Sequence, residues 1–178
     1  MKLELEATQK ALSKFGKDVI IKAATYLQTR KRGYDTGKLM KSLDYDLGVA
    51  ANSISLKIRM EDYGLAINEG RGKSGGGSGV LYPKILEWVK RKGLRPRNSK
   101  GQYEAWRNKA QQQRGIAYVV TRKIHRFGYK GTGFFDDAFA QSYKKLPKKL
   151  TQAFALDLEN FLNFTIDEIN NGTNSNKT

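Results

Sequence analysis

Two glycine-rich stretches, residues 68–79 and 127–135, constrain the fold of this chain more than any other feature. Glycine reaches positive φ and lets two backbone segments approach closely, so ordered elements are expected to stop and turn at both stretches. Residues 71–79 also have the composition of a flexible linker. We interpret both stretches as backbone devices that present charged and aromatic side chains, and not as catalytic loops.

Apolar residues at helical spacing predict a long amphipathic helix over residues 5–27, with Lys and Gln on its opposite face. Its apolar positions are Leu5, Leu12, Phe15, Val19, Ala23, Tyr26 and Leu27. Gly33 follows a basic segment and is expected to end this helix. Asp35 and Thr36 are then expected to cap a short helical turn over residues 37–43.

Alternation of apolar and polar residues over positions 53–60 predicts a strand with one buried face. Residues 43–49 alternate in the same way, and the short connection between the two segments predicts an antiparallel hairpin. Residues 63–67 fit either a third strand or a helical turn.

Three further helices are expected in the second half of the chain. Pro83 lies in the first turn of one, which Gly93 ends; another runs from about Gln111 to Phe127; and Pro147 opens the last. The predicted inward positions are Ile85, Leu86, Trp88 and Val89 in the first, Ile116, Ala117, Val120, Ile124 and Phe127 in the second, and Leu150, Phe154, Leu158, Phe161, Leu162, Ile166 and Ile169 in the last. We expect Phe154, Leu158, Phe161 and Leu162 of the last stripe to be buried against the first helix or the sheet.

These elements predict an α+β fold, in which a small antiparallel sheet is packed by long N-terminal and C-terminal amphipathic helices, with a basic helical insertion. The length and the 39% hydrophobic content suit one domain with one modest core. We expect that domain over residues 1–170, with a glycine-rich and basic insertion at 71–114 and a polar tail at 171–178.

The charge is concentrated in one part of the chain. The net charge is +16, and residues 84–130 hold fourteen Lys or Arg against two acids, a local net charge of +12. Such an excess favours contact with nucleic acid or with acidic protein surfaces. The residues expected to meet that partner on an exposed surface are Arg91, Lys92, Arg95, Arg97, Lys100, Arg107 and Lys109.

Aromatic residues are interleaved with this basic segment, at Trp88, Tyr103, Trp106 and Tyr129. They could stack on bases, as they do in proteins that bind single strands. The alternative, which we favour, is that they anchor an exposed excursion at 94–114 to the core, because Trp88 falls on the apolar side of its helix and no recognised nucleic-acid motif is present.

Residues typical of enzyme sites are scarce. His125 is the only histidine and is expected on the surface, and Asp136 with Asp137 more plausibly caps a helix near Ala138 than binds a metal. Glu69 has no evident catalytic partner and is expected to pair with Arg71 or with an adjacent subunit. The tract at 71–79 lacks the Gly-Lys-Ser/Thr ending of a phosphate-binding loop. We therefore expect no catalytic residue, no metal and no cofactor.

The chain contains no cysteine, no signal peptide and no run of about 20 apolar residues. A reducing compartment, no membrane partner and a soluble protein made in the cytoplasm are therefore expected.

Three short segments occur in a recognisable order. They are Thr-Gly-x-Leu-x-x-Ser at residues 36–42, a tyrosine followed seven positions later by glycine at 63–70, and Gly-x-x-Phe-Phe at 131–135. With the long first helix and the hairpin, this order resembles the tail-completion or minor tail protein family of tailed bacteriophages over residues 1–165. The basic insert between Gly70 and Gly115 departs from the family pattern.

The resemblance implies a non-enzymatic virion protein of the head–tail joining region or tail end, assembled in the host cytoplasm as a ring that we expect to have six copies. Its expected partners are other copies, other neck and tail proteins, and the DNA passing through the lumen, with no small-molecule substrate. The loops expected to contact other subunits contain Glu69, Gly70, Arg71, Gly72, Gly131, Gly133 and Phe134.

Two other functions remain open at this stage. A DNA-binding or genome-packaging-associated protein would use the basic segment to grip phosphates. A phage-borne nuclease is disfavoured because the chain offers few metal ligands.

Overall fold

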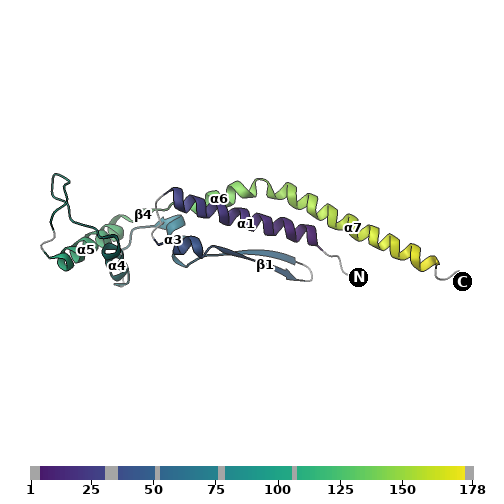
Figure 1. Cartoon of the computed structure of the whole chain (residues 1–178), viewed down its shortest axis with the longest axis horizontal. Coiled ribbons are helices and arrows are strands. Elements are labelled where there is room, and N and C mark those ends of the chain that lie inside the picture. Colours follow the sequence, from purple (N-terminus) through teal and green to yellow (C-terminus); the bar gives the residue numbers. More distant parts are fainter. Residues whose placement is uncertain (1–4, 31–35, 51–52, 76–78, 106–107, 175–178) are drawn as a thin grey trace. The chain divides into compact units, whose positions relative to one another are not determined.

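The computed structural model describes residues 5–30, 36–50, 53–75, 79–105 and 108–174, with side chains up to Asp167. The chain divides into two compact units, which are described separately below. Unit 1 comprises residues 1–68 and 132–178, and unit 2 comprises residues 69–131. Helices and short antiparallel strands make up both units, which confirms the predicted α+β class (Figure 1).

The described part of unit 1 contains five helices and one hairpin. Its elements are α1 (Glu6–Thr29), α2 (Lys38–Lys41), β1 (Asp44–Ala50), β2 (Ser53–Arg59), α3 (Tyr63–Glu69, whose last residue belongs to unit 2), α6 (Phe134–Tyr143) and α7 (Leu146–Asn174). The first helix and the hairpin lie where the sequence predicts them. Residues 63–67, which the sequence left open, are helical.

The hairpin covers one side of α1 with its apolar face. Strands β1 and β2 pair antiparallel, with Tyr45 opposite Ile58 and Leu47 opposite Leu56. These side chains are half-buried, whereas the alternate positions along both strands are exposed. The Tyr45 hydroxyl lies 2.7 Å from the Ser13 hydroxyl of α1. The predicted alternation is therefore confirmed, and its buried face packs on the first helix.

The core of unit 1 brings together segments that are distant in the sequence. Ala23 and Leu27 of α1 pack with Leu39, Leu43, Phe134 and Ala138. A second cluster joins Phe15 and Val19 of α1 to Leu146 at the start of α7. Every predicted apolar position of α1 is buried or half-buried. Helix α1 is thus the central element against which α6, α7 and the hairpin pack.

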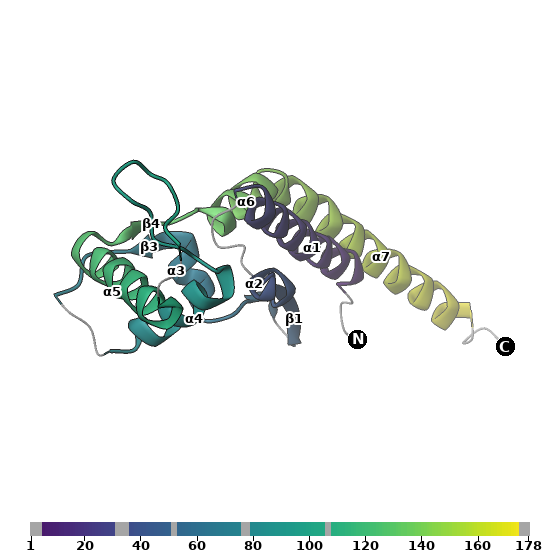
Figure 2. The same cartoon turned by 60° about the vertical axis from the view of Figure 1, so that its left-hand side comes forward.

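Helix α7 runs antiparallel to α1 and continues past its start, as both views of the molecule show (Figures 1 and 2). Leu146 and Leu150 contact the middle of α1, whereas Asp157 contacts its first turn. The helix continues from there to Asn174, so its last part adds about 25 Å at 1.5 Å per residue. The expected polar tail at 171–178 is therefore helical as far as Asn174.

The predicted burial of the last apolar stripe is wrong in this structure. Phe154, Leu158, Leu162 and Ile166 are between 41% and 54% exposed. Only Leu150 and Phe161 are half-buried, and the side chain of Ile169 lies outside the described residues. The reason is geometric. Leu146, Leu150 and Asp157 lie on the face that meets α1, whereas residues four apart shift around the helix, so the row that starts at Leu150 leaves that face. The stripe residues after Asp157 also lie beyond the first turn of α1.

Unit 2 is a helical pair closed by a short strand pair. Its elements are β3 (Gly70–Arg71), α4 (Leu81–Lys92), α5 (Lys109–Phe127) and β4 (Tyr129–Lys130). Gly70 pairs with Lys130 and Arg71 with Tyr129, so the two glycine-rich stretches meet where the chain enters and leaves this unit. The expected insertion at 71–114 corresponds to its first part, and the compact unit continues to Gly131.

Glycine is required beside the β3–β4 strand pair, through which the chain enters and leaves unit 2 and which is called the glycine neck below. Gly70 has φ +91° and Gly128 has φ +68°. A Cβ at Gly70 would overlap the carbonyl oxygen of Tyr129, and a Cβ at Gly128 would overlap that of Arg71. Both stretches are thus backbone devices, as the sequence indicated. Gly72 has neither constraint, since a Cβ there would have nothing within 4 Å.

Helices α4 and α5 pack against each other through a small buried face. Val89 and Ala117 are fully buried, and Gln113 and Thr121 lie on the same side of α5. Gly93 ends α4 in the left-handed conformation, as predicted. The prediction for Phe127 is wrong, because it lies at the last position of α5 and is 60% exposed.

Candidate functional site

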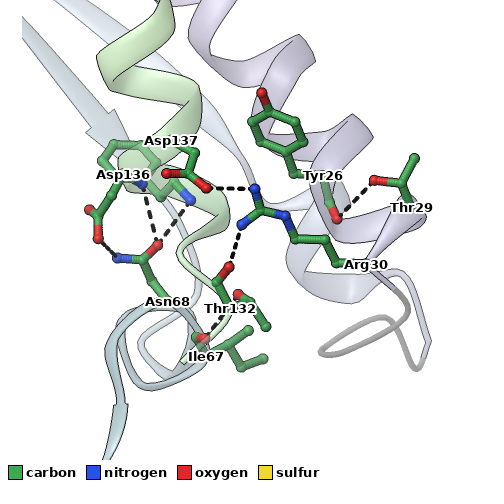
Figure 3. Close-up of polar contacts among 9 residues, drawn as sticks. Tyr26, Thr29, Arg30, Ile67, Asn68, Thr132, Asp136 and Asp137 are labelled. Atoms are coloured by element: carbon green, nitrogen blue, oxygen red, sulfur yellow. Dashed lines mark hydrogen bonds and ion pairs between the residues drawn. The ribbon is translucent and has the colours of Figure 1, made fainter. Parts of the chain in front are cut away.

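Asn68 and Arg30 organise the start of α6 (Figure 3). The preceding residue, Gly133, has no side chain with which to cap the helix. Asn68 supplies the cap from another part of the chain, since its Oδ1 accepts from the N–H of Phe135 at 2.9 Å and its Nδ2 donates to Asp136 at 2.9 Å. Its side chain is buried, so the amide is held by these bonds.

Arg30 follows α1 and fixes the same helix start from the other side. Its guanidinium donates to the Thr132 carbonyl, meets the Asp137 carboxylate at 2.5 Å and lies 4.6 Å from the centre of the Tyr26 ring. The N–H of Thr132 also donates to the Ile67 carbonyl at 2.9 Å. The predicted acidic pair therefore lies in the first turn of α6 and does not cap a helix near Ala138.

This cluster joins the three segments that carry the phage-tail resemblance. Leu39 comes from the first segment, Asn68 from the second and Phe134 from the third. Leu39 and Phe134 share one core cluster, and Asn68 bonds to the start of α6 beside it. The hydrogen bonds of Asn68 and Arg30 therefore hold distant segments of unit 1 together.

Asp157 caps the start of α1 in a similar way, from a distant part of the chain. Leu5, at the N-cap position of α1, makes no side-chain cap, and Asp157 of α7 accepts from the N–H groups of Ala7 at 2.8 Å and Thr8 at 2.9 Å and from the Thr8 hydroxyl at 2.7 Å. Burial alone would raise the pKa of this carboxyl, but these hydrogen bonds and the charge of Lys10 lower the pKa below its usual value. The carboxylate also faces the positive end of the α1 dipole.

The predicted basic contact residues lie on the exposed surface of unit 2. Arg91 and Lys92 end α4, Lys109 begins α5, and Arg95, Arg97 and Lys100 lie in the loop between the helices. Arg107 is outside the described residues. The expectation of exposure is confirmed for the six that are described.

The loop between α4 and α5 contains a small ordered hairpin, so the expected excursion is not shapeless. Arg97 pairs with Tyr103, and its guanidinium bonds to the Tyr103 hydroxyl at 2.7 Å while lying 4.4 Å from the ring centre. Asn98 turns the chain, because its Oδ1 accepts from the N–H groups of Lys100 and Gln102. Tyr103 is 64% exposed, and Tyr129, another of the interleaved aromatics, is 41% exposed.

The loops expected to contact other subunits are largely used within the protomer. Gly70, Arg71 and Gly131 lie in or beside the neck pair, and Gly133 precedes α6. Phe134 is fully buried in the core of its own chain, so its side chain packs within the protomer. Glu69 and Gly72 are exposed, and the ion pairs seen among the described residues include none between Glu69 and Arg71.

His125 also differs from its expected surface position. It is half-buried, and its Nδ1 lies 2.7 Å from the Ser74 hydroxyl while its carbonyl accepts from the Ser74 N–H at 2.8 Å. The pair ties the glycine-rich segment to α5. Within the described residues, no three His, Cys, Asp or Glu side chains are grouped so that they could hold a metal ion.

Sequence reasoning missed both remote caps and the exposed part of α7. One signal was available for Asp157, since a helix that begins after Leu5 has no Ser, Thr, Asp or Asn to cap it and needs an acceptor from elsewhere.

Among the residues that the structure describes, no helix is both long enough and apolar enough to cross a membrane. Comparisons with family models, with curated proteins and with solved structures give no match.

Proposed function

We propose that this chain is a structural virion protein of a tailed bacteriophage. In this proposal it forms a ring at the head–tail joining region or tail end and is needed for tail completion and head–tail attachment. The role is non-enzymatic, the partners are other copies and neighbouring neck and tail proteins, and the ring has six copies.

The observation that carries this proposal is the apolar surface that α7 leaves uncovered. Phe154, Leu158, Leu162 and Ile166 are all more than 40% exposed on a helix that extends past the start of α1. Rows of exposed leucine and phenylalanine are uncommon on monomeric proteins and mark surfaces that other proteins cover. An assembly subunit accounts for such a surface.

The resemblance of the three short segments to phage tail proteins is our reason for assigning the proposed assembly to a phage particle. In the fold, these segments form one continuous region around Leu39, Asn68 and Phe134, and are not scattered over unrelated loops. Their shared role in building unit 1 supports treating them as parts of one motif.

The proposal is tested on virions of the phage that encodes the chain. A cryo-EM map is expected to show the protein as a closed ring of six copies on the tail axis, and a nonsense mutation in its gene is expected to give heads and tails that do not join. Absence of the protein from purified particles, or isolated copies away from the tail axis, would contradict the proposal.

A DNA-binding or packaging-associated role is the second candidate, and the Arg97–Tyr103 pair favours it. An exposed ring stacked with a guanidinium, in the loop between α4 and α5 of a basic unit, suits contact with bases and phosphates. Fluorescence anisotropy with a single-stranded oligonucleotide tests this role. Binding through six to ten phosphates would fall by roughly 10³–10⁵ between 50 and 200 mM salt, and binding that is absent at 50 mM salt would exclude the role.

A further inference from the structure

The free end of α7 combines exposed apolar residues with negative charge. Residues 150–176 contain four Asp or Glu and no Lys or Arg. Leu158, Leu162 and Ile166 recur every four residues and are exposed. Glu159 lies beside Ile166 around the helix, and Asp167 lies at the edge of this side, opposite Leu158. Asp157 is the exception, because it is buried against α1. This surface, formed by Leu162, Ile166 and Glu159 with Leu158 and Asp167 at its two edges, is called the acidic face below.

The outer face of α5 has the opposite charge and a similar apolar content. Val119, Arg122, Lys123 and Arg126 share one side of the helix at spacings of three and four residues, and all are exposed. Tyr118 lies beside them and is 58% exposed. The described ion pairs engage none of these three cations. This surface, from Tyr118 to Arg126, is called the basic face below.

We propose that the acidic face of one copy binds the basic face of a second copy. Unit 2 holds sixteen Lys or Arg against three acids, so a second copy presents a strong opposite charge to α7. Each face also offers apolar side chains that contact would remove from water. The inference deepens the proposed function and rests on it for the ring itself, since it names the two surfaces through which the copies meet.

The contact is heterologous, because the two faces belong to different parts of the chain. Such a contact leaves one acidic and one basic face open at the ends of a dimer, and a ring forms when the rotation between copies closes. Opposite charges also steer the two faces together, so association is expected to weaken as salt rises. Neighbours related in this way would place a basic unit against an acidic helix at every interface.

Two charge-reversal variants of the full chain test the proposal. One carries Glu159→Lys with Asp167→Lys, and the other carries Arg122→Glu with Lys123→Glu. Each makes both of its faces the same sign, so neither is expected to self-associate. A mixture restores opposite charges at every contact. The control is Lys148→Glu with Lys149→Glu, which changes the net charge by the same amount as Arg122→Glu with Lys123→Glu but at exposed positions near the start of α7, outside both faces.

Sedimentation velocity at 50 mM salt provides the measurement. We expect wild type and the control to associate at tens of micromolar, each reversal variant to stay monomeric with unchanged circular dichroism, and an equimolar mixture to associate again. A fourth variant with all four reversals in one chain is also expected to associate. A monomeric wild type, a reversal variant that still associates, or a mixture that stays monomeric would each overturn the inference. The last result would indicate that the two faces do not join separate copies.

The failure of this inference can be separated from failure of the proposed function. If virions contain the ring but both reversal variants assemble normally in solution and in particles, the named faces are wrong and the function stands. If the mixture restores association but the protein is absent from virions, the contact stands and the virion role is wrong.

Discussion

Unit 1 buries phenylalanine and leucine from four helices and ties two helix starts with remote polar side chains, whereas unit 2 buries one valine and one alanine beside two polar residues. Within the described part of unit 2, Gln112 Oε1 and Thr121 Oγ1 are buried without a hydrogen-bond partner. Such groups lower stability. The difference indicates that unit 1 is the more stable part of the protein, and that unit 2 has the smaller core and relies on the close backbone approach at its glycine neck.

The largest expected effect is at the centre of unit 1. Phe134→Ala should lower the free energy of unfolding by about 3–5 kcal/mol, because it removes a fully buried ring. Phe154→Ala is the matched control, since Phe154 is 48% exposed and its loss should cost less than about 1 kcal/mol. Urea denaturation measures both, and equal costs would show that α7 is covered within the protomer.

The next effect tests the neck of unit 2. Gly128→Ala should cost about 1–3 kcal/mol from backbone strain, with a further loss from overlap with the Arg71 carbonyl. Gly72→Ala should change stability by less than about 0.5 kcal/mol. Hydrogen exchange resolves the two units, and faster exchange confined to unit 2 is expected for Gly128→Ala. Faster exchange in α1 instead would contradict a local role for the neck.

A smaller effect is expected at the remote cap of α1. Asp157→Ala should cost about 1–2 kcal/mol at neutral pH, because two N–H groups lose their acceptor. Glu159→Ala, at an exposed neighbour, should be neutral within about 0.5 kcal/mol. Thermal unfolding measures both variants.

The same cap predicts a pH dependence. Because the pKa of Asp157 is lowered in the folded state, its stabilising contribution is present above its unfolded pKa, about 3.9, and is lost as pH falls through the folded pKa. The difference between wild type and Asp157→Ala should therefore shrink in acid. A difference that stays constant from pH 7 down to pH 2 would show that the carboxylate charge does not matter.

The smallest effect on stability is expected on the surface of unit 2. Replacing Arg97, Lys100 and Lys109 with Ser should change the free energy of unfolding by about 0.5 kcal/mol or less per site, because all three are exposed. Partner binding or assembly should decline instead. Normal particle yield and unchanged DNA binding in the triple variant would indicate that these charges only face solvent.

Elements that depend on local patterns could be predicted from the sequence. The period of α1, the alternation of the β1–β2 hairpin and the end of α4 at Gly93 all follow from neighbouring residues. The stripe on α7 shows why such patterns have limits. Periodicity predicted an amphipathic helix, but only the start of its apolar row, at Leu150, meets α1, together with Leu146 and Asp157. The later members of the row lie off this face or beyond the first turn of α1.

The remote caps could not be predicted for a related reason. Asp157 and Ala7 are 150 residues apart, and Asn68 and Phe135 are 67 apart. No local spacing rule connects such pairs, since only the packed core brings them together. The basic surface could be predicted from the excess of Lys and Arg in the sequence. The Arg97–Tyr103 hairpin within it could not, because only the structure shows that these two backbone segments pair.

Cross-linking of an isotopically mixed sample tests most directly whether assembly uses the two faces. Equal amounts of ¹⁴N and ¹⁵N full-length protein are joined with a zero-length reagent that links carboxylates to lysine, and the products are identified by mass spectrometry. We predict links between Glu159 or Asp167 of one copy and Lys123 of another, found in mixed-isotope pairs and lost at high salt. Links among these residues that occur only within single-isotope products would contradict the account.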